Sequence, residues 1–156
     1  MILIITAFPG TQTKKLCKTI ALRFGLRHFG KEDAEKIMKE KGWEELKQRI
    51  QEEEKKGKFV TDSMIAGKQV QKSVKVFLNS AKRSRAKSIA ELEKIPVASA
   101  LELIEEEQQS LEKSAKTIFG TEAFVPEELD LMLNIDRLDE NSTINLIEKF
   151  LEKIQK

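Results

Sequence analysis

The sequence has 156 residues, of which 40% are hydrophobic and 35% are charged, and its formal net charge is +2. These values are typical of one globular domain, and we expect residues 1–156 to share one core. The longest apolar stretch near the start, Met1–Ile5, is too short for a membrane span or a signal-peptide core. The single cysteine, Cys17, excludes an internal disulfide, so we expect a cytoplasmic protein with no membrane contact.

The N-terminal segment predicts a strand, a tight turn and a helix. Residues 2–5 (Ile-Leu-Ile-Ile) are typical of a buried parallel strand, and the Pro9–Gly10 pair ends it. Apolar residues then recur at helical spacing over residues 16–24, and Gly25 ends the helix. The lone histidine, His28, is expected to be a structural residue on a second strand.

Strands and helices alternate along the rest of the chain. Residues 31–56 predict a helix pair broken at Gly42, with Trp43 packing the pair over the sheet. Further strands are expected at 58–62, 73–78 and 129–135, and further helices at 81–93, from Pro96 onward and after a cap at Asn141 or Ser142. This alternation predicts an α/β protein with a mostly parallel sheet covered on both faces. A ligand is then expected at the carboxyl ends of the strands, where the turn at 8–13 lies.

Charges are distributed unevenly along the chain. Residues 1–31 hold six basic residues, residues 68–87 hold seven, and neither segment contains an acid. Residues 101–130 hold nine acids and two lysines. This asymmetry indicates either solvated helix faces or a surface that binds a polyanion such as RNA. For the second interpretation, the candidate anion-binding residues are Arg83, Arg85 and Lys87.

Several short strings occur along the chain in the order in which one enzyme family has them. They are residues 24–26 (Phe-Gly-Leu), 56–60 (Lys-Gly-Lys-Phe-Val), 65–67 (Ile-Ala-Gly), 75–78 (Lys-Val-Phe-Leu), 85–87 (Arg-Ala-Lys), 118–120 (Ile-Phe-Gly) and 130–131 (Asp-Leu). With the strand–turn–helix opening, they make the chain resemble the archaeal type of cytidylate kinase, a nucleoside monophosphate kinase. The resemblance implies a P-loop kinase-like parallel sheet of five strands. It also implies helical insertions at about 31–56, for base binding, and about 95–118, for the lid.

The phosphate loop of that family, G-x-x-x-x-G-K-[ST], is altered here. In the family, backbone N–H groups surround the phosphates, the lysine neutralises their oxygens and the hydroxyl ligates magnesium. Ala7, Gln12, Thr13 and Lys14 stand at the two glycine positions, the lysine position and the hydroxyl position. The degenerate loop thus comprises Pro9, Gly10, Thr11, Gln12, Thr13, Lys14 and Lys15. Because one residue turns a helical side chain by about 100°, we expect Lys14 to point away from the phosphate position unless the loop is remodelled.

Two further departures concern the lid and the end of a central strand. The resemblance implies basic lid residues at positions that hold Ser88, Leu92, Glu107, Glu112 and Ser114 here, and only Arg85 matches a basic position. The family's acid-glycine-arginine string is Asp62-Ser63-Met64 in this chain. Asp62 could hold magnesium through water or could cap a helix or turn, and we favour the cap.

Other candidates for chemistry are few. With His28 as the only histidine, we expect neither a histidine-based metal site nor a catalytic pair. Cys17 is expected to be a small core residue.

We therefore expect a degenerate cytidylate kinase-like protein that is catalytically inactive and acts as a binding or partner-recognition module. The partner would be an unknown protein or RNA, and a nucleotide is a further candidate ligand. Two alternatives stay open: a weakly active CMP kinase that uses ATP, and an RNA- or ribosome-associated factor. No cofactor is expected for the first function, and magnesium and ATP belong only to the kinase alternative.

Overall fold

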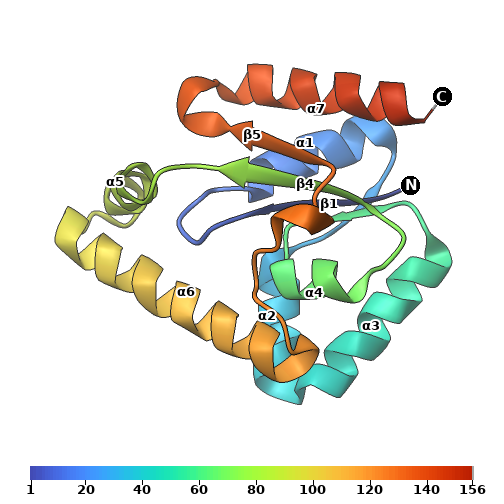
Figure 1. The fold of residues 1–156 in the computed structure, drawn as a ribbon, viewed down its shortest axis with the longest axis horizontal. Coiled ribbons are helices and arrows are strands. Elements are labelled where there is room, and N and C mark those ends of the chain that lie inside the picture. The colour runs from blue at the N-terminus through green and yellow to red at the C-terminus, as the bar shows by residue number, and fades with distance from the viewer. Residues whose placement is uncertain (156) are drawn as a thin grey trace.

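A computed structural model describes residues 1–155, which form one five-stranded parallel sheet flanked by helices (Figure 1). The strands are β1 (Ile2–Ala7), β2 (Arg27–Phe29), β3 (Phe59–Thr61), β4 (Val74–Asn79) and β5 (Leu131–Asn134). Their order is β2-β3-β1-β4-β5, and every neighbouring pair is parallel. In register, Ile4 of the central strand pairs with Thr61 on one side and Lys75 on the other. The carboxyl ends of all five strands therefore lie along one edge of the sheet.

Seven α-helices and two short 3-10 turns complete the described residues. The helices are α1 (Lys14–Phe24), α2 (Lys31–Lys41), α3 (Trp43–Lys56), α4 (Met64–Gln69), α5 (Lys82–Glu93), α6 (Val97–Phe119) and α7 (Glu140–Ile154). The 3-10 turns are η1 (Pro126–Glu128) and η2 (Ile135–Arg137).

The two faces of the sheet bury separate apolar clusters, because successive side chains of a strand point to opposite faces. Leu3 and Ile5 pack with residues of α1 and α7 on one face. Ile4 packs with residues of α2, α3 and α4 on the other. Helix α4 approaches β1 so closely that a Cβ added to Gly67 would lie 2.6 Å from Ile4 Cγ2. Both faces of the sheet are thus covered, as the apolar strand sequences predict.

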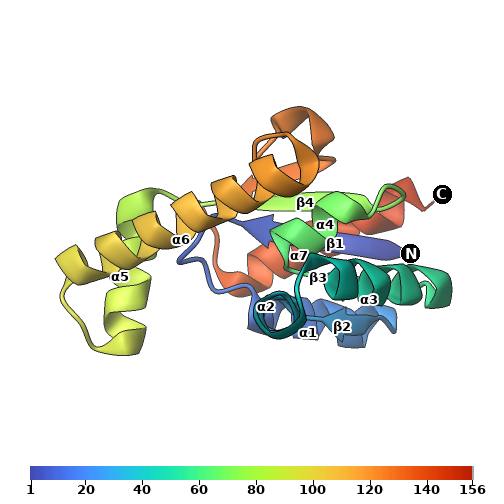
Figure 2. The same cartoon turned by 90° about the horizontal axis from the view of Figure 1, so that it is seen from below.

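Helices α5 and α6 form a third cluster, built on the small side chains of Ala86, Ala90 and Ala100 together with Ile104. Figure 1 shows α5 beyond the arrowhead of β4 and α6 running back beneath the sheet, and Figure 2 shows the same pair from below. The Trp43 ring meets the Phe119 ring edge to face, with centroids 5.5 Å apart, which joins α3 to the far end of α6. The helix pair therefore lies across the carboxyl edge of the sheet, where a ligand is expected.

The parallel α/β fold with five strands is confirmed, and so is the helix break at Gly42. Helix α4 was not expected, because its six residues are too few to show helical periodicity. The predicted cap of the last helix at Asn141 or Ser142 is wrong. Asp139 caps α7, and its Oδ1 accepts a hydrogen bond of 2.7 Å from the backbone N of Ser142. Among the described residues, no helix is both long enough and apolar enough to cross a membrane.

The cap of α7 gives a test of the fold. Replacing Asp139 by Ala removes the side-chain acceptor for the Ser142 N–H, and we expect the melting temperature to fall by a few degrees. The matched control is Asn141→Ala, at an exposed position in the first turn of the same helix whose side chain does not make the cap bond, and it should melt like the unchanged protein. The opposite ranking of the two variants in thermal unfolding would contradict this assignment.

Candidate functional site

The loop that joins β1 to α1, residues 8–13, lies at the carboxyl edge of the sheet. Strands β3 and β2 lie to one side of β1, and β4 and β5 lie to the other. Such a reversal of strand order opens a crevice outside the carboxyl ends, which is where open parallel sheets bind their ligands. The loop is therefore the candidate ligand-binding segment.

Asp62, directly after β3, joins this loop to α2. Its Oδ2 accepts a hydrogen bond of 2.7 Å from Thr13 Oγ1, and its Oδ1 accepts one of 2.7 Å from the backbone N of Lys31. Lys31 is the first residue of α2, so Asp62 satisfies a helix N–H that would otherwise lack a partner. Thr13 precedes α1 and makes no capping bond with its own helix, because its hydroxyl donates to Asp62. The side chain of Thr13, which stands at the lysine position of the kinase phosphate loop, thus points toward the end of β3.

Arg85 of α5 is fixed on the same loop from the other side. Its Nη1 donates a hydrogen bond of 2.7 Å to the carbonyl of Pro9, and its Nε donates one of 3.2 Å to the carbonyl of Ser80. The guanidinium carbon also lies 5.3 Å from the centre of the Phe8 ring, within cation–π range. Arg85 is therefore engaged with protein groups, and it holds a loop carbonyl toward α5.

Gly10 leaves no space between the loop and α6. Its φ is +93°, and a Cβ built there would lie 2.8 Å from Ile104 Cδ1 and 3.0 Å from Arg85 Cβ. The turn around it is closed by a hydrogen bond of 3.3 Å from the Thr11 N to the Phe8 carbonyl. The apolar side chain of Ile104 thus covers the tip of the loop, where a phosphate-binding loop would face its ligand.

The lysines that follow the loop form ion pairs on the surface. Lys14 Nζ lies 2.9 Å from Glu32 Oε2, and Lys15 Nζ lies 3.6 Å from Glu140 Oε1. The hydrogen bond and the charge of Glu32 raise the pKa of Lys14, and Lys14 in turn lowers the pKa of Glu32. Lys14 therefore points toward α2, which agrees with the rotation expected from its position one residue after Thr13.

A cavity of about 250 Å³ lies beside the loop, between α2, α4 and α6. Its apolar lining residues are Ala7, Pro9, Ala34, Met38, Leu46, Met64, Ile65 and Leu111. Lys31, Asp62 and Glu107 also line it, and Lys31 Nζ lies 3.6 Å from Glu107 Oε2 across the gap between α2 and α6. An apolar cavity with a few polar groups at its rim is the usual form of a small-molecule site, and this one is slightly smaller than the usual minimum of ~300 Å³.

Similar solved structures carry the same arrangement of strands and helices along nearly the whole chain. An uncharacterised protein from Eubacterium ventriosum ATCC 27560 is 14% identical, with a TM-score of 0.81 over 98% of both chains. The shikimate kinase of Bacteroides thetaiotaomicron is 13% identical, with a TM-score of 0.62 over 97% of this chain and 98% of that one. The chain has a P-loop kinase-like fold.

Another similar structure is the YorR protein from Bacillus subtilis, in complex with phosphorylated GDP. It is 12% identical, with a TM-score of 0.62 over 97% of this chain and 96% of that one. No protein-family model matches the sequence, and no curated protein matches it.

The structure brings some of the predicted site residues together and separates others. Thr13 and Asp62, which are 49 positions apart, share a hydrogen bond, and Gln12 Nε2 donates to Ser88 Oγ at 3.0 Å. Arg83 and Lys87 are exposed on α5, whereas Arg85 faces the loop. The anion-binding role of these three residues stays a prediction.

Sequence reasoning missed Ile104, the cavity, and the position of His28 beside Asp62. Ile104 carries only the signal of an ordinary apolar position on a helix, so no pattern distinguishes it. The closeness of His28 and Asp62 follows from the pairing of β2 with β3, in which Phe29 lies opposite Thr61. This pairing depends on the strand order, which the sequence analysis did not assign.

The contact between the loop and α6 can be tested with a double-mutant cycle. Gly10→Ala should destabilise the protein, because it combines a positive φ with a clash against Ile104. In the Ile104→Ala background part of the clash disappears, so we expect a coupling of about 0.5–3 kcal/mol in chemical denaturation.

The matched control is Gly25→Ala, which has a similar positive φ of +62° but nothing within 4 Å of the added Cβ. Its destabilisation should be the same with and without Ile104. Additive effects of Gly10→Ala and Ile104→Ala would show that α6 does not press on the loop.

Proposed function

We propose that this chain is a P-loop kinase-like protein that does not transfer phosphate and serves as a binding module. The observation that carries the proposal is the occupied loop. Thr13 donates a hydrogen bond to Asp62, while Arg85 of α5 and Ile104 of α6 contact the loop. A nucleotide phosphate would have to displace the side chains of both α5 and α6.

The chemistry of phosphoryl transfer supports this proposal. Such transfer depends on positive charge and on backbone N–H donors placed in advance around the phosphates. Here the lysine position holds a neutral threonine, one loop N–H, that of Thr11, is turned back to the Phe8 carbonyl, and the Pro9 carbonyl faces Arg85. The loop thus offers a nucleotide neither the lysine charge nor the Thr11 N–H, and the nearby Arg85 is engaged by the Pro9 carbonyl.

The lid helix carries the opposite charge from the one that transfer requires. Glu105 of α6 pairs with Lys82 at 3.3 Å, and Glu107 pairs with Lys31 at 3.6 Å. Two lysines near the site are therefore already neutralised by carboxylates. The acids hold α6 against α5 and α2 and leave little net positive charge for a triphosphate.

A weak CMP kinase is the second candidate, and the fold is the observation that favours it. The similar structures include kinases, and the YorR protein was solved with phosphorylated GDP. The resemblance to cytidylate kinase would make CMP the acceptor in this case. An RNA-associated role rests only on exposed basic residues such as Arg83 and Lys87.

The cavity beside the loop is the site that we propose for a ligand of the binding module. Its apolar residues suit the flat face of a base or ring, and Lys31 and Lys39 suit an anionic group at the rim. Of the altered loop positions only Ala7 lines the cavity, and Gln12, Thr13 and Lys14 do not, so ligand binding there can persist after phosphoryl transfer is lost.

The first test is nucleotide affinity. Calorimetric titration with Mg-ATP should give a dissociation constant no tighter than about millimolar, because the loop lacks its lysine and is covered by Ile104. CMP-dependent ATP turnover should be absent in the same preparation. A micromolar constant for Mg-ATP, or steady turnover, would overturn the proposal.

A rebuilt loop serves as the positive control. The variant combines Ala7→Gly, Gln12→Gly, Thr13→Lys and Lys14→Thr with Ile104→Ala, which removes the cover. It should gain measurable triphosphate binding, since the N–H donors and a lysine are restored. Turnover should stay absent because the lid still lacks arginines. Robust turnover by this variant would show that the lid is competent.

The second test addresses the cavity. CMP should bind the unchanged protein without any requirement for ATP, with its base in the apolar part of the cavity. Ser114→Trp, at a lining position on α6, should fill the space and weaken CMP at least tenfold. Lys113→Trp, on the exposed side of the same helix, is the matched control and should bind as before. Equal affinity for all three proteins, or no CMP binding at all, would contradict this placement.

A further inference from the structure

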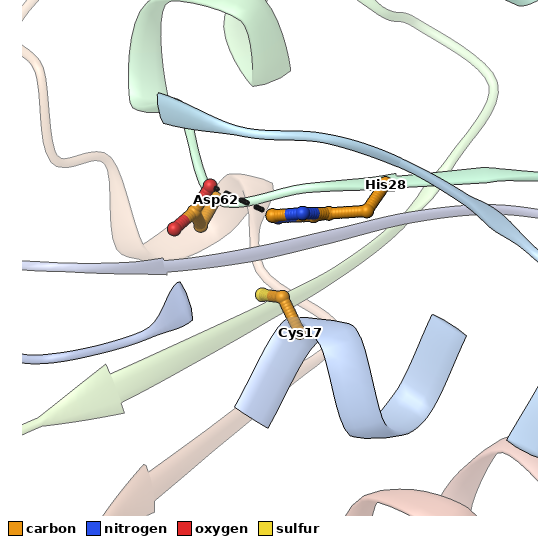
Figure 3. A group of neighbouring side chains, drawn as sticks. All are labelled: Cys17, His28 and Asp62. Atoms are coloured by element: carbon orange, nitrogen blue, oxygen red, sulfur yellow. Dashed lines mark ion pairs between the residues drawn. The ribbon is translucent and has the colours of Figure 1, made fainter. Parts of the chain in front are cut away.

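Three side chains that bind metals in other proteins meet beneath the loop (Figure 3). Cys17 comes from α1, His28 from β2, and Asp62 follows β3. One ligand atom from each lies within 4.8 Å of the other two. Cys17 is fully buried, and the side chains of His28 and Asp62 are 15% and 5% exposed.

His28 has an unsatisfied atom in this group. Its Nε2 is buried and makes no hydrogen bond, and it lies 3.6 Å from Asp62 Oδ1. Buried polar atoms in folded proteins nearly always have a hydrogen-bond partner or a bound ion. The unbonded His28 Nε2, next to a thiol and a carboxylate, therefore indicates a missing ligand. The ring also occupies space that a side chain at position 30 would take, since a Cβ on Gly30 would lie 3.1 Å from His28 Cε1.

We propose that Cys17, His28 and Asp62 bind a divalent transition-metal ion of the zinc type. Thiolate, imidazole and carboxylate are the ligands that zinc takes in proteins, at about 2.0–2.3 Å. A point central to three atoms no more than 4.8 Å apart lies at most about 2.8 Å from each. Movements of less than about 1 Å in each side chain would therefore bring all three into the coordination sphere, with a fourth position left for water.

Charge balance favours such an ion. A coordinated thiol loses its proton, and one thiolate with one carboxylate neutralises a divalent cation. The site would then carry no net charge in the core.

Asp62 is already oriented for this role by its neighbours. Thr13 Oγ1 and the Lys31 N each donate to one carboxylate oxygen, which fixes the carboxylate and leaves further lone pairs free. Hydrogen bonds of this kind around a metal ligand tune its affinity. Asp62 also lines the cavity between α2 and α6, which gives an ion a route from solvent.

A bound ion would link the edge strand β2 to α1 and to the end of β3. It would also stabilise the loop at Thr13, which is bonded to Asp62. This inference does not depend on whether the chain transfers phosphate. It departs from the sequence-based expectation of no metal site, which counted histidines and did not consider one histidine with a cysteine and an aspartate.

Cobalt(II) titration of the metal-free full chain is the direct experiment, with zinc competition to obtain affinities. Because Cys17 is the only cysteine, a cobalt–thiolate charge-transfer band can come only from this site. The band should saturate at one ion per chain and should vanish in Cys17→Ala. His28→Gln and Asp62→Asn should each weaken binding more than tenfold, and Thr13→Val should weaken it by about 10–100-fold through the orientation of Asp62.

Asp136→Asn is the matched control, because Asp136 also follows a strand and also accepts two hydrogen bonds, from Ser80 Oγ and the Ala81 N. It should bind cobalt like the unchanged protein. Zinc should also raise the melting temperature of the unchanged protein and not that of Cys17→Ala. No thiolate band in the unchanged protein, or full affinity in both His28→Gln and Asp62→Asn, would overturn the proposal.

Discussion

Asp62 is the residue on which the arrangement of the site depends. Its two oxygens accept from Thr13 in the loop and from the first N–H of α2, so one carboxylate at the end of β3 ties two segments together. The side chain is almost fully buried, and a buried carboxylate is tolerated only when its oxygens are hydrogen-bonded. Loss of either donor would therefore leave an unsatisfied charge and loosen both the loop and α2.

Helices α5 and α6 also hold the loop in place. Arg85 donates a hydrogen bond to the Pro9 carbonyl, and Ile104 packs on Gly10, so the loop is stabilised by protein groups in place of a ligand. Phosphate-binding loops bind anions because their backbone N–H donors have no hydrogen-bond partner within the protein. Here one of these donors, the Thr11 N–H, is already bonded to the Phe8 carbonyl, which supports our proposal that this kinase-like fold binds a ligand without transferring phosphate.

Local patterns were sufficient to predict the fold, whereas the site depends on contacts between distant segments. The apolar runs predicted four of the strands and the helical spacings predicted the break at Gly42, because these features are local, whereas the count of five strands came from the family resemblance. The departures at Gln12 and Thr13 were also visible in the sequence. The bond from Thr13 to Asp62 and the packing of Ile104 were not, since each joins segments far apart in the chain. The contact between His28 and Asp62 was not visible either, because it also joins segments far apart in the chain. The cap at Asp139 was missed because an asparagine, which is also a common cap residue, stands two residues later.

The loop at which a kinase would bind phosphates is covered here by side chains of the protein itself. The most direct measurement is an NMR titration of the isotope-labelled chain with Mg-ATP, following the backbone amides of residues 10–15. We predict that the chemical shifts of these amides stay unchanged up to millimolar nucleotide, because Arg85 and Ile104 already fill their surroundings. Saturable shifts of the loop amides at micromolar nucleotide, with release of Arg85 from the Pro9 carbonyl, would contradict it.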